Sequence, residues 1–289
     1  MPLLPVSELE QAAPVFRGKA GNAFAKMLLG AFGMTEVERV YTAVEGKSGH
    51  EAASAILSEV GVSYSLIGEE NLKGLGDGPF ITISNHPIGS LDGIILVDCM
   101  AKLRPDYKII VNKVLSRVKV LESNFISVTP TGETRTAPTA ESISGIREAM
   151  RHVKDGHPLG LFPSGAVSDK ILGPRPTVKM PDGSSYVEPR VRDREWQMPI
   201  VRFIEKVNVP VIPIRFFDGN TDFYYNLGAF LGWKVRLLRF PREMTNKRGK
   251  TIRLGVGPVI TPERQKQCAD TEELRTLLRG SVYGQNLPG

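Results

Sequence analysis

The stretch Phe80-Ile-Thr-Ile-Ser-Asn-His-Pro-Ile-Gly-Ser-Leu-Asp-Gly-Ile-Ile-Leu-Val-Asp-Cys-Met100 decides the fold class. It begins with a short β-rich run, Phe80–Ser84, and a turn that contains Pro87 and Gly89 follows at once. Ile94–Met100 then has the composition of a buried helix. A strand, a turn and a buried helix in succession are typical of an α/β sheet, in which ligands bind beyond the carboxyl ends of the strands.

The same alternation continues towards the carboxyl terminus. Hydrophobic runs predict further strands at Tyr107–Val111, Leu159–Phe162, Val209–Phe217 and Thr251–Gly257. Val209–Phe217 contains two prolines, which favour an edge or irregular strand because proline cannot donate to a sheet ladder. Between these strands, an apolar helical face over residues 143–153 ends at Asp155-Gly156, and Thr261 with Pro262 opens a late helix. We therefore predict an α/β fold, with a mixed, mostly parallel sheet flanked by helices.

Two other segments differ from this pattern. Residues 1–60 are predicted to be helical: Asn22–Gly33 is apolar almost all round, and Glu36–Ser58 is a helical region interrupted near Gly46. Arg175–Arg192 is mostly polar, with three prolines and one glycine, and is predicted to be a long surface loop. We expect an N-terminal helical segment, residues 1–60, as a candidate for membrane-surface contact, and an α/β domain over residues 61–289.

Composition excludes several classes of protein. The 289 residues are 41% hydrophobic and 24% charged, which excludes disordered, collagen-like and disulfide-scaffold proteins. A net charge of +6 fits an anionic partner, whether a membrane, an acyl carrier or a nucleic acid. Cys99 and Cys268 lie far apart in the chain, so we expect both to be reduced. The first ten residues do not resemble a signal peptide, and no apolar run reaches the roughly 18 residues of a membrane span.

One of the four histidines, His86, stands directly after the strand Phe80–Ser84. Ser90 is expected to cap the following helix, which puts Asp92 in its first turn, where the helix dipole favours a carboxylate. That carboxylate can accept a hydrogen bond from one imidazole nitrogen and leave the other to take a proton from a hydroxyl. The alternative is a turn histidine that only caps the helix.

Phe162-Pro-Ser-Gly-Ala-Val-Ser-Asp169 also follows a strand. Backbone N–H groups around Gly165 could bind an anion or a developing oxyanion, although an ordinary turn fits as well. Ser164 is not in a Gly-x-Ser-x-Gly elbow, and the Ser-x-x-Lys match at Ser116 is short enough to arise by chance. No cluster of residues indicates a metal site.

Four blocks in this order resemble the 1-acylglycerol-3-phosphate acyltransferase superfamily: Asn85–Asp92, Asn124–Ile126, Phe162–Gly165 and Val209–Pro213. Two further stretches, Val191–Trp196 and Leu237–Lys250, resemble its bacterial branch of hemolysin-like and ornithine- or glycine-lipid O-acyltransferases. The resemblance covers about residues 75–260.

The resemblance implies an O-acyltransferase in which His86 is the general base on the acceptor hydroxyl and Asp92 orients it. It also implies that Asn85, Ser164 and Gly165 take part in substrate binding. Transfer is expected to be direct, from the thioester of acyl carrier protein or coenzyme A as co-substrate, with no bound cofactor.

The resemblance also bears on the acceptor. Where the glycerophosphate enzymes have Phe-Pro-Glu-Gly-Thr-Arg-Ser, this chain has Ser164, Ala166 and Val167 in place of Glu, Thr and Arg. Because that Arg serves phosphate binding, a lyso-aminolipid of the ornithine or glycine type is favoured as the acceptor. A lysophosphatidate acyltransferase is the alternative.

Basic residues are the remaining candidates. Four arginines could bind an anionic donor or the acceptor headgroup, although each alone also fits a structural role: Arg135, Arg192, Arg194 and Arg215. Lys234–Arg253 holds eight basic residues and one acidic residue, with apolar residues between them. This composition suits an anionic membrane surface, an acyl carrier protein or the phosphates of coenzyme A.

Two other classes of function fit the sequence less well. A non-catalytic, hemolysin-like membrane-binding protein would carry a secretion signal or a long amphipathic hairpin, and the sequence has neither. A nucleic acid is not expected as a partner, because no helix-turn-helix, zinc or RNA-binding signature is present. We expect a peripheral enzyme on the cytoplasmic face of the inner membrane.

Overall fold

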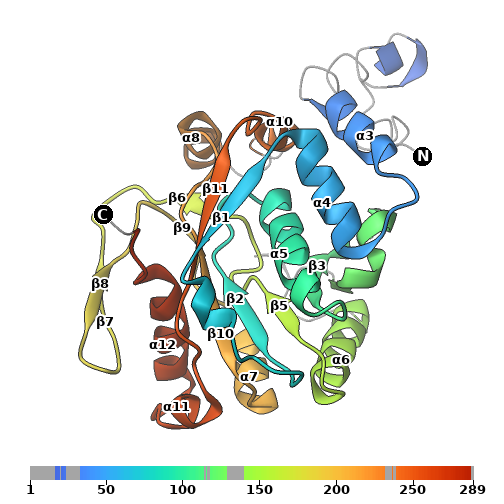
Figure 1. Ribbon diagram of the computed structural model, residues 1–289. Helices are drawn as coiled ribbons and strands as arrows, with labels where there is room; N and C mark the ends of the chain where they lie inside the picture. Colours follow the sequence, from blue (N-terminus) through green and yellow to red (C-terminus); the bar gives the residue numbers. More distant parts are fainter. Residues whose placement is uncertain are drawn as a thin grey trace.

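The computed structural model describes residues 17–19, 21–23, 33–113, 115, 118–128, 140–231, 236 and 239–287. Its centre is a seven-stranded sheet of order β1-β11-β10-β2-β5-β3-β4 (Figure 1). The strands are β1 (Ser63–Ile67), β2 (Ile81–Ser84), β3 (Lys108–Asn112), β4 (Phe125–Val128), β5 (Leu159–Leu161), β10 (Val211–Phe216) and β11 (Thr251–Val256). All neighbouring pairs are parallel except β10 and β11. The predicted mixed, mostly parallel sheet is therefore confirmed.

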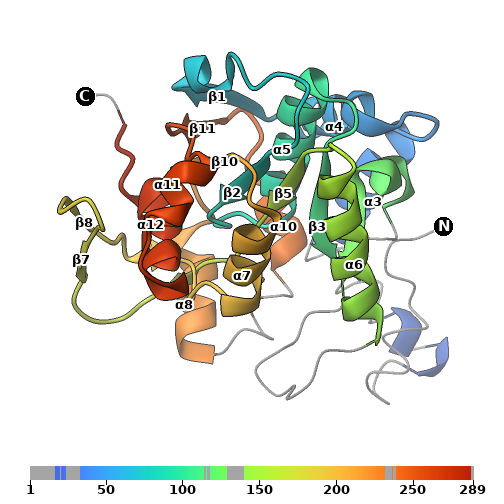
Figure 2. The same ribbon diagram turned by 90° about the horizontal axis from the view of Figure 1, so that it is seen from below.

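Helices cover both faces of this sheet (Figure 2). On one face lie α3 (Met34–Ala43), α4 (Gly49–Val60) and α5 (Ser90–Leu103); on the other lie α6 (Ala140–Lys154), α7 (Met198–Val207) and α12 (Thr271–Tyr283). The short α11 (Pro262–Lys266) precedes α12, and Thr261 caps it as predicted, accepting the Arg264 N–H. Because side chains alternate along a strand, Ile212 joins the core under α5, whereas Val211 joins the core on the opposite face.

Helix α5 is the buried helix that the decisive stretch predicts. Every residue from Leu91 to Ala101 is buried, because α4 packs on its outer side and the sheet on its inner side. The expected cap at Ser90 is wrong by one residue, since the cap position is Gly89. The Asp92 carboxylate accepts the Gly89 N–H at 2.9 Å, so Asp92 rather than the Ser90 hydroxyl satisfies the helix start.

The edge position expected for the proline-containing strand is also wrong. β10 lies inside the sheet, between β11 and β2. Pro213 is tolerated there because its nitrogen and carbonyl face β11, whose ladder with β10 begins only at Ile214. The Pro213 carbonyl instead accepts the Gly257 N–H at 2.8 Å. No ladder donor is therefore missing at this proline.

The flanking segments are described in part. The helical break near Gly46 is confirmed, since α3 and α4 flank it, while residues 24–32 of the apolar N-terminal stretch lie outside the described residues. The polar segment over 175–192 is at the surface, but it is not all loop. A hairpin of β7 (Thr177–Lys179) and β8 (Ser185–Val187) is followed by β9 (Val191–Arg192), which pairs with β6 (Asp169–Lys170). Within the described residues, none of the helices has the length and hydropathy needed to cross a membrane.

Candidate active site

His86 lies in the turn between β2 and α5, at the carboxyl end of β2. Its Nδ1 is 3.0 Å from Asp92 Oδ2, and its ring stacks on Phe162 with centroids 4.0 Å apart. The side chain is 19% exposed, whereas that of Asp92 is fully buried. Nε2 has no hydrogen-bond partner among the described residues, so it is the ring nitrogen that can meet a substrate.

The Asp92 carboxylate is held at the start of α5. Oδ2 accepts the N–H groups of Ile88 and Gly89, each at 2.9 Å, in addition to the His86 ring. Free N–H groups at a helix start favour an anion there. An ionised carboxylate on Nδ1 requires the proton on that nitrogen, which leaves Nε2 unprotonated and able to act as a base. The six-residue spacing therefore brings His86 and Asp92 together as the sequence predicts.

The turn itself needs glycine at position 89. Gly89 has φ 102°, a value that residues with a side chain rarely adopt. A Cβ there would collide with the ring of Phe240, the first residue of α10 (Phe240–Thr245). α10 thus covers the start of α5, and the second branch-specific stretch forms one wall of the site.

The backbone of His86 is clamped by a second carboxylate. Asp193 Oδ1 accepts the His86 N–H at 3.1 Å, and the Ser168 N–H donates to the His86 carbonyl at 2.8 Å. The other oxygen of this carboxylate, Oδ2, accepts the indole N–H of Trp196 at 3.1 Å.

The other side of the turn is held by residues that follow β10. The Pro87 carbonyl accepts the hydroxyl of Tyr225 at 2.7 Å, and the Ile88 carbonyl accepts from Asn220 Nδ2 at 3.0 Å. Tyr225 belongs to α8 (Asp222–Leu231). Sequence reasoning missed both residues, because they lie more than 130 positions from the turn and belong to no motif.

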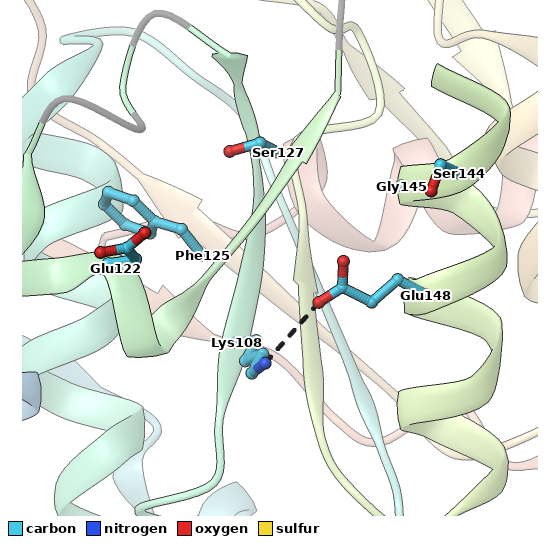
Figure 3. A pocket seen from close by; sticks show the side chains of 7 residues that line it. All are labelled: Lys108, Glu122, Phe125, Ser127, Ser144, Gly145 and Glu148. Carbon is cyan, nitrogen blue, oxygen red and sulfur yellow. Dashed lines mark ion pairs between the residues drawn. The ribbon is translucent and has the colours of Figure 1, made fainter. Parts of the chain in front are cut away.

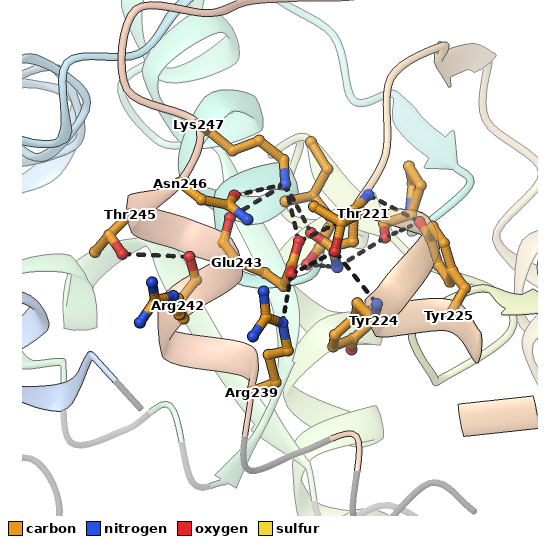
Figure 4. Close-up of polar contacts among 12 residues, drawn as sticks. Thr221, Tyr224, Tyr225, Arg239, Arg242, Glu243, Thr245, Asn246 and Lys247 are labelled. Carbon is orange, nitrogen blue, oxygen red and sulfur yellow. Dashed lines mark hydrogen bonds and ion pairs between the residues drawn. The ribbon is translucent and has the colours of Figure 1, made fainter. Parts of the chain in front are cut away.

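Asn220 is in turn bonded by Lys247, which forms a buried ion pair with Glu243 (Figure 4). Lys247 Nζ lies 3.2 Å from Asn220 Oδ1 and 3.3 Å from Glu243 Oε2. Burial opposes ionisation of Glu243, but hydrogen bonds from Thr221 and the charge of Lys247 outweigh it and lower its pKa. Burial in turn lowers the pKa of Lys247, although Glu243 opposes that shift. Lys247 and Arg236 are both buried, so part of the basic stretch 234–253 faces inward.

The sequence of this chain is similar to known proteins. The family model described as "Acyltransferase" matches residues 34–283. The chain belongs to the acyltransferase family. It is 26% identical over 246 residues to a lyso-glycine lipid O-acyltransferase of Phocaeicola vulgatus, covering 83% of this chain and 79% of that protein. A protein with the same description from Bacteroides thetaiotaomicron is 26% identical over 220 residues, 74% of this chain and 72% of its own length.

A solved structure is also similar. It is the 1-acyl-sn-glycerophosphate (LPA) acyltransferase PlsC of Thermotoga maritima, with 16% identity and a TM-score of 0.49 over 81% of this chain and 75% of that one. The family match establishes that this protein is an enzyme that transfers acyl groups, and the two relatives support the branch that the sequence motifs indicate.

In the acyltransferase, the turn after β5 is tightly bonded to itself. The Gly165 N–H donates to the Phe162 carbonyl at 2.9 Å, and Ser164 Oγ donates to the Ala166 carbonyl at 2.7 Å. Gln197 Nε2 donates to the Ser164 carbonyl at 3.0 Å. The Gly165 N–H is therefore engaged within the turn, and a substrate-binding role for Ser164 or Gly165 stays a prediction.

The predicted binding arginines of the acyltransferase are not gathered around His86. Arg192 bonds the Pro189 carbonyl and pairs with Glu188 at 2.8 Å. Arg194 pairs with Asp169 at 2.7 Å. Arg135 lies outside the described residues. Among the described residues, no hydrogen bond or ion pair joins Arg192 or Arg194 to His86 or Asp92.

Arg215 and Asn85 line one cavity beside β10. Arg215 bonds the carbonyls of Tyr283 and Gln285, and burial lowers its pKa. Asn85 exchanges two hydrogen bonds with the backbone of Phe216, at 2.9 and 2.7 Å, and so ties the turn to β10. Both line a cavity of about 250 Å³ that His86 does not line.

A larger cavity of about 430 Å³ opens between β3, β4 and α6 (Figure 3). Lys108 and Glu148 face one another across it at 3.8 Å. Neither His86 nor Asp92 lines this cavity, so it is separate from the catalytic pair.

Proposed function

We propose that this acyltransferase moves a fatty acyl group from an acyl thioester to the hydroxyl of a lysolipid, with a lyso-aminolipid of the glycine or ornithine type as acceptor. The observation that carries the chemistry is the His86–Asp92 pair, with Nδ1 held at 3.0 Å and Nε2 without a partner among the described residues. The lipid class is supported by the two relatives described as lyso-glycine lipid O-acyltransferases.

In the proposed mechanism Nε2 of His86 removes the proton of the acceptor hydroxyl as its oxygen attacks the thioester carbonyl. Asp92 accepts the Nδ1–H and stabilises the imidazolium that forms. The tetrahedral intermediate then collapses, the carbon–sulfur bond breaks, and the leaving thiolate takes the proton back from Nε2. The products are an ester and a free thiol, and the histidine returns to its neutral form.

The surroundings of Val167 favour an acceptor without a phosphate at this position. Val167 lies against the start of α5, since its Cγ2 would be 3.3 Å from a Cβ at Gly89. Its side chain offers no charge or hydrogen bond. The guanidinium of Arg236 bonds the Val167 carbonyl at 3.4 Å, but it also pairs with Asp169 at 2.5 Å, so its charge is compensated within the protein.

We further propose that α8 lies on an anionic bilayer, on the cytoplasmic face of the inner membrane. Phe223 and Phe230 are seven residues apart, so they lie on one face of this helix, and they are 55% and 70% exposed. The guanidinium of Arg239 lies 4.6 Å from the centre of the Phe223 ring. Exposed aromatic rings beside arginine suit the headgroup region of an anionic membrane. α8 also contacts α10 through Tyr224 and Phe240, and Phe240 lies against Gly89 of the His86 turn, so α8 is close to that turn. α8 and α10 lie at the same end of the sheet (Figure 1).

The decisive experiment is acyl transfer by the purified protein and its His86→Ala variant. The donors are an acyl carrier protein thioester and an acyl coenzyme A, and the acceptors are a lyso-glycine lipid and lysophosphatidate. We expect turnover of the lyso-glycine lipid that falls by about 10²–10⁴-fold in the variant, the range for loss of a general base.

Each other outcome corrects a different part of the proposal. Transfer to lysophosphatidate at an equal or higher rate would refute the argument from Val167. Wild-type turnover by His86→Ala would refute the catalytic assignment. Vesicle binding without transfer to either acceptor would favour the non-catalytic alternative.

A further inference from the structure

We propose that Asp193 is a positioning residue: its buried carboxylate holds the backbone of His86 so that the imidazole meets Asp92 and the acceptor in the right place. This inference rests on the role proposed above for His86. Neither the family match nor the relatives assign any task to Asp193. It lies 107 residues beyond His86 in the chain.

The first support is the set of contacts. Asp193 Oδ1 accepts both the His86 N–H at 3.1 Å and the Ser168 hydroxyl at 2.6 Å. The backbone N–H of Ser168 donates to the His86 carbonyl at 2.8 Å. Both polar backbone groups of His86 are therefore bonded: Asp193 accepts from its N–H, and Ser168 donates to its carbonyl. Oδ2 is oriented by the indole N–H of Trp196 at 3.1 Å.

The second support is that the segment carrying Asp193 is fixed to a rigid element. The Asp193 N–H donates to the hydroxyl of Tyr283 at 2.7 Å, and Arg279 donates to the Asp193 carbonyl at 3.0 Å. Both residues belong to α12, and Arg279 also pairs with the buried Glu188 at 2.6 Å. The position of the His86 backbone is thus set by a helix packed on the opposite face of the sheet.

The third support is that burial of the Asp193 carboxylate opposes its ionisation. Asp193 is 2% exposed and, in the described part of the chain, no Lys or Arg side chain forms an ion pair with it. Burial raises its pKa, although bonds from Ser168, the His86 N–H and Trp196 and the charge of Arg279 oppose the shift. Because burial raises the pKa, ionisation of this group lowers the stability of the fold as pH rises through the folded pKa.

The consequence for catalysis is geometric. His86 must present Nδ1 to Asp92 and Nε2 to the hydroxyl at the same time. A misplacement of about 1 Å at a reacting group can lower the rate by about 10²-fold. The Asp193 and Ser168 bonds act on the polar backbone groups of His86 itself, whereas the bonds of Asn220 and Tyr225 act on the residues that follow it.

The main test is Asp193→Ala, with Asp98→Ala as the matched control. Asp98 is equally buried at 2% exposure and accepts hydrogen bonds from Ser54, Tyr64 and Lys102, but it contacts no part of the His86 turn. We expect Asp193→Ala to lower kcat by about 10–100-fold with KM within about twofold of wild type. Asp98→Ala should lower the melting temperature and leave kcat within about twofold.

A conservative variant provides a rescue. Asparagine keeps one acceptor oxygen for the His86 N–H, but its amide would oppose the Trp196 N–H, so Asp193→Asn is combined with Trp196→Phe. Trp196→Phe alone is its control. We expect the double variant to recover most of the kcat lost in Asp193→Ala, without the buried charge.

A double-mutant cycle separates positioning from general damage. In a His86→Ala background, Asp193→Ala should change the residual rate by less than about twofold, because it acts through His86. An equal loss in both backgrounds would overturn the positioning role. So would wild-type kcat in Asp193→Ala while His86→Ala is inactive, and that result would leave the proposed function intact. Full activity of His86→Ala would instead refute the proposed function itself.

Discussion

Replacing Asp92 by asparagine removes the negative charge of this side chain and keeps its shape. Oδ2 accepts three hydrogen bonds, from His86, Ile88 and Gly89, while Oδ1 is buried with no hydrogen-bond partner among the described residues. An asparagine can therefore keep its oxygen on the three donors and place its amide nitrogen at the position of Oδ1. The turn should keep its geometry, and the imidazolium should lose its counter-charge.

The expected loss follows from the 3.0 Å separation of the His86 ring nitrogen and the carboxylate. Two unit charges at that distance attract by about 5.5 kcal/mol at an effective dielectric constant of about 20. Delocalisation of the imidazolium charge over the ring reduces this to about 3 kcal/mol or more. Each 1.36 kcal/mol changes a rate tenfold, so we expect kcat to fall by about 10²–10⁴-fold.

The assay is steady-state acyl transfer to the lyso-glycine lipid, with thermal unfolding as the check on the fold. Asp98→Asn, in the same helix α5 and equally buried, is the control and should keep kcat within about twofold. Wild-type kcat in Asp92→Asn would refute the claim that the Asp92 charge stabilises the imidazolium. A loss that appears only together with unfolding would refute it as well.

The other predictions concern the buried ion pair and the membrane surface. Lys247→Met should lower the free energy of unfolding by about 1.5–3 kcal/mol in urea titrations, because the buried Glu243 then keeps only one of its two ion-pair partners, Arg239 at 3.2 Å. The lowered pKa of Glu243 means that its contribution to stability is present above its ordinary pKa of 4.5 and is lost as pH falls through its lower folded pKa. Unfolding curves of Glu243→Gln measured between neutral pH and about pH 3 should therefore show a shallower acid loss than those of the wild type, and identical slopes would contradict this. Replacing Phe223 and Phe230 by serine should weaken sedimentation with anionic vesicles by about 10- to 100-fold. Leu103→Ser, 54% exposed at the far end of α5, should leave vesicle binding unchanged, and equal losses in both variants would argue against an α8 surface.

Sequence reasoning succeeded where an element is buried on both sides. β2 was predicted from a short β-rich run and α5 from an apolar run, with a turn that contains proline and glycine between them. The two strands of the central sheet that it missed, β1 and β4, are the edges of that sheet. Each is only partly buried, so its apolar pattern is too weak to stand out from the surrounding residues.

The proline of β10 misled for a related reason. A proline predicts an edge strand only if its nitrogen points at a neighbouring strand that requires a donor. At Pro213 the neighbouring ladder begins one residue later, and that register depends on how β11 docks. Such a register is a tertiary property, and no local pattern in the chain reports it.

By itself, the sequence determined that His86 and Asp92 meet. His86 and Asp92 are six residues apart in one turn, so the local conformation of a strand, a turn and a helix start is enough to bring an imidazole to a carboxylate. Only the tertiary structure decided what holds that turn. Asp193, Asn220 and Tyr225 reach it from more than 100 residues away, because β9, β10 and α8 converge at the carboxyl end of β2. Contacts within a turn follow from a few dihedral angles, whereas contacts between distant segments exist only after the sheet has assembled and its core has been buried.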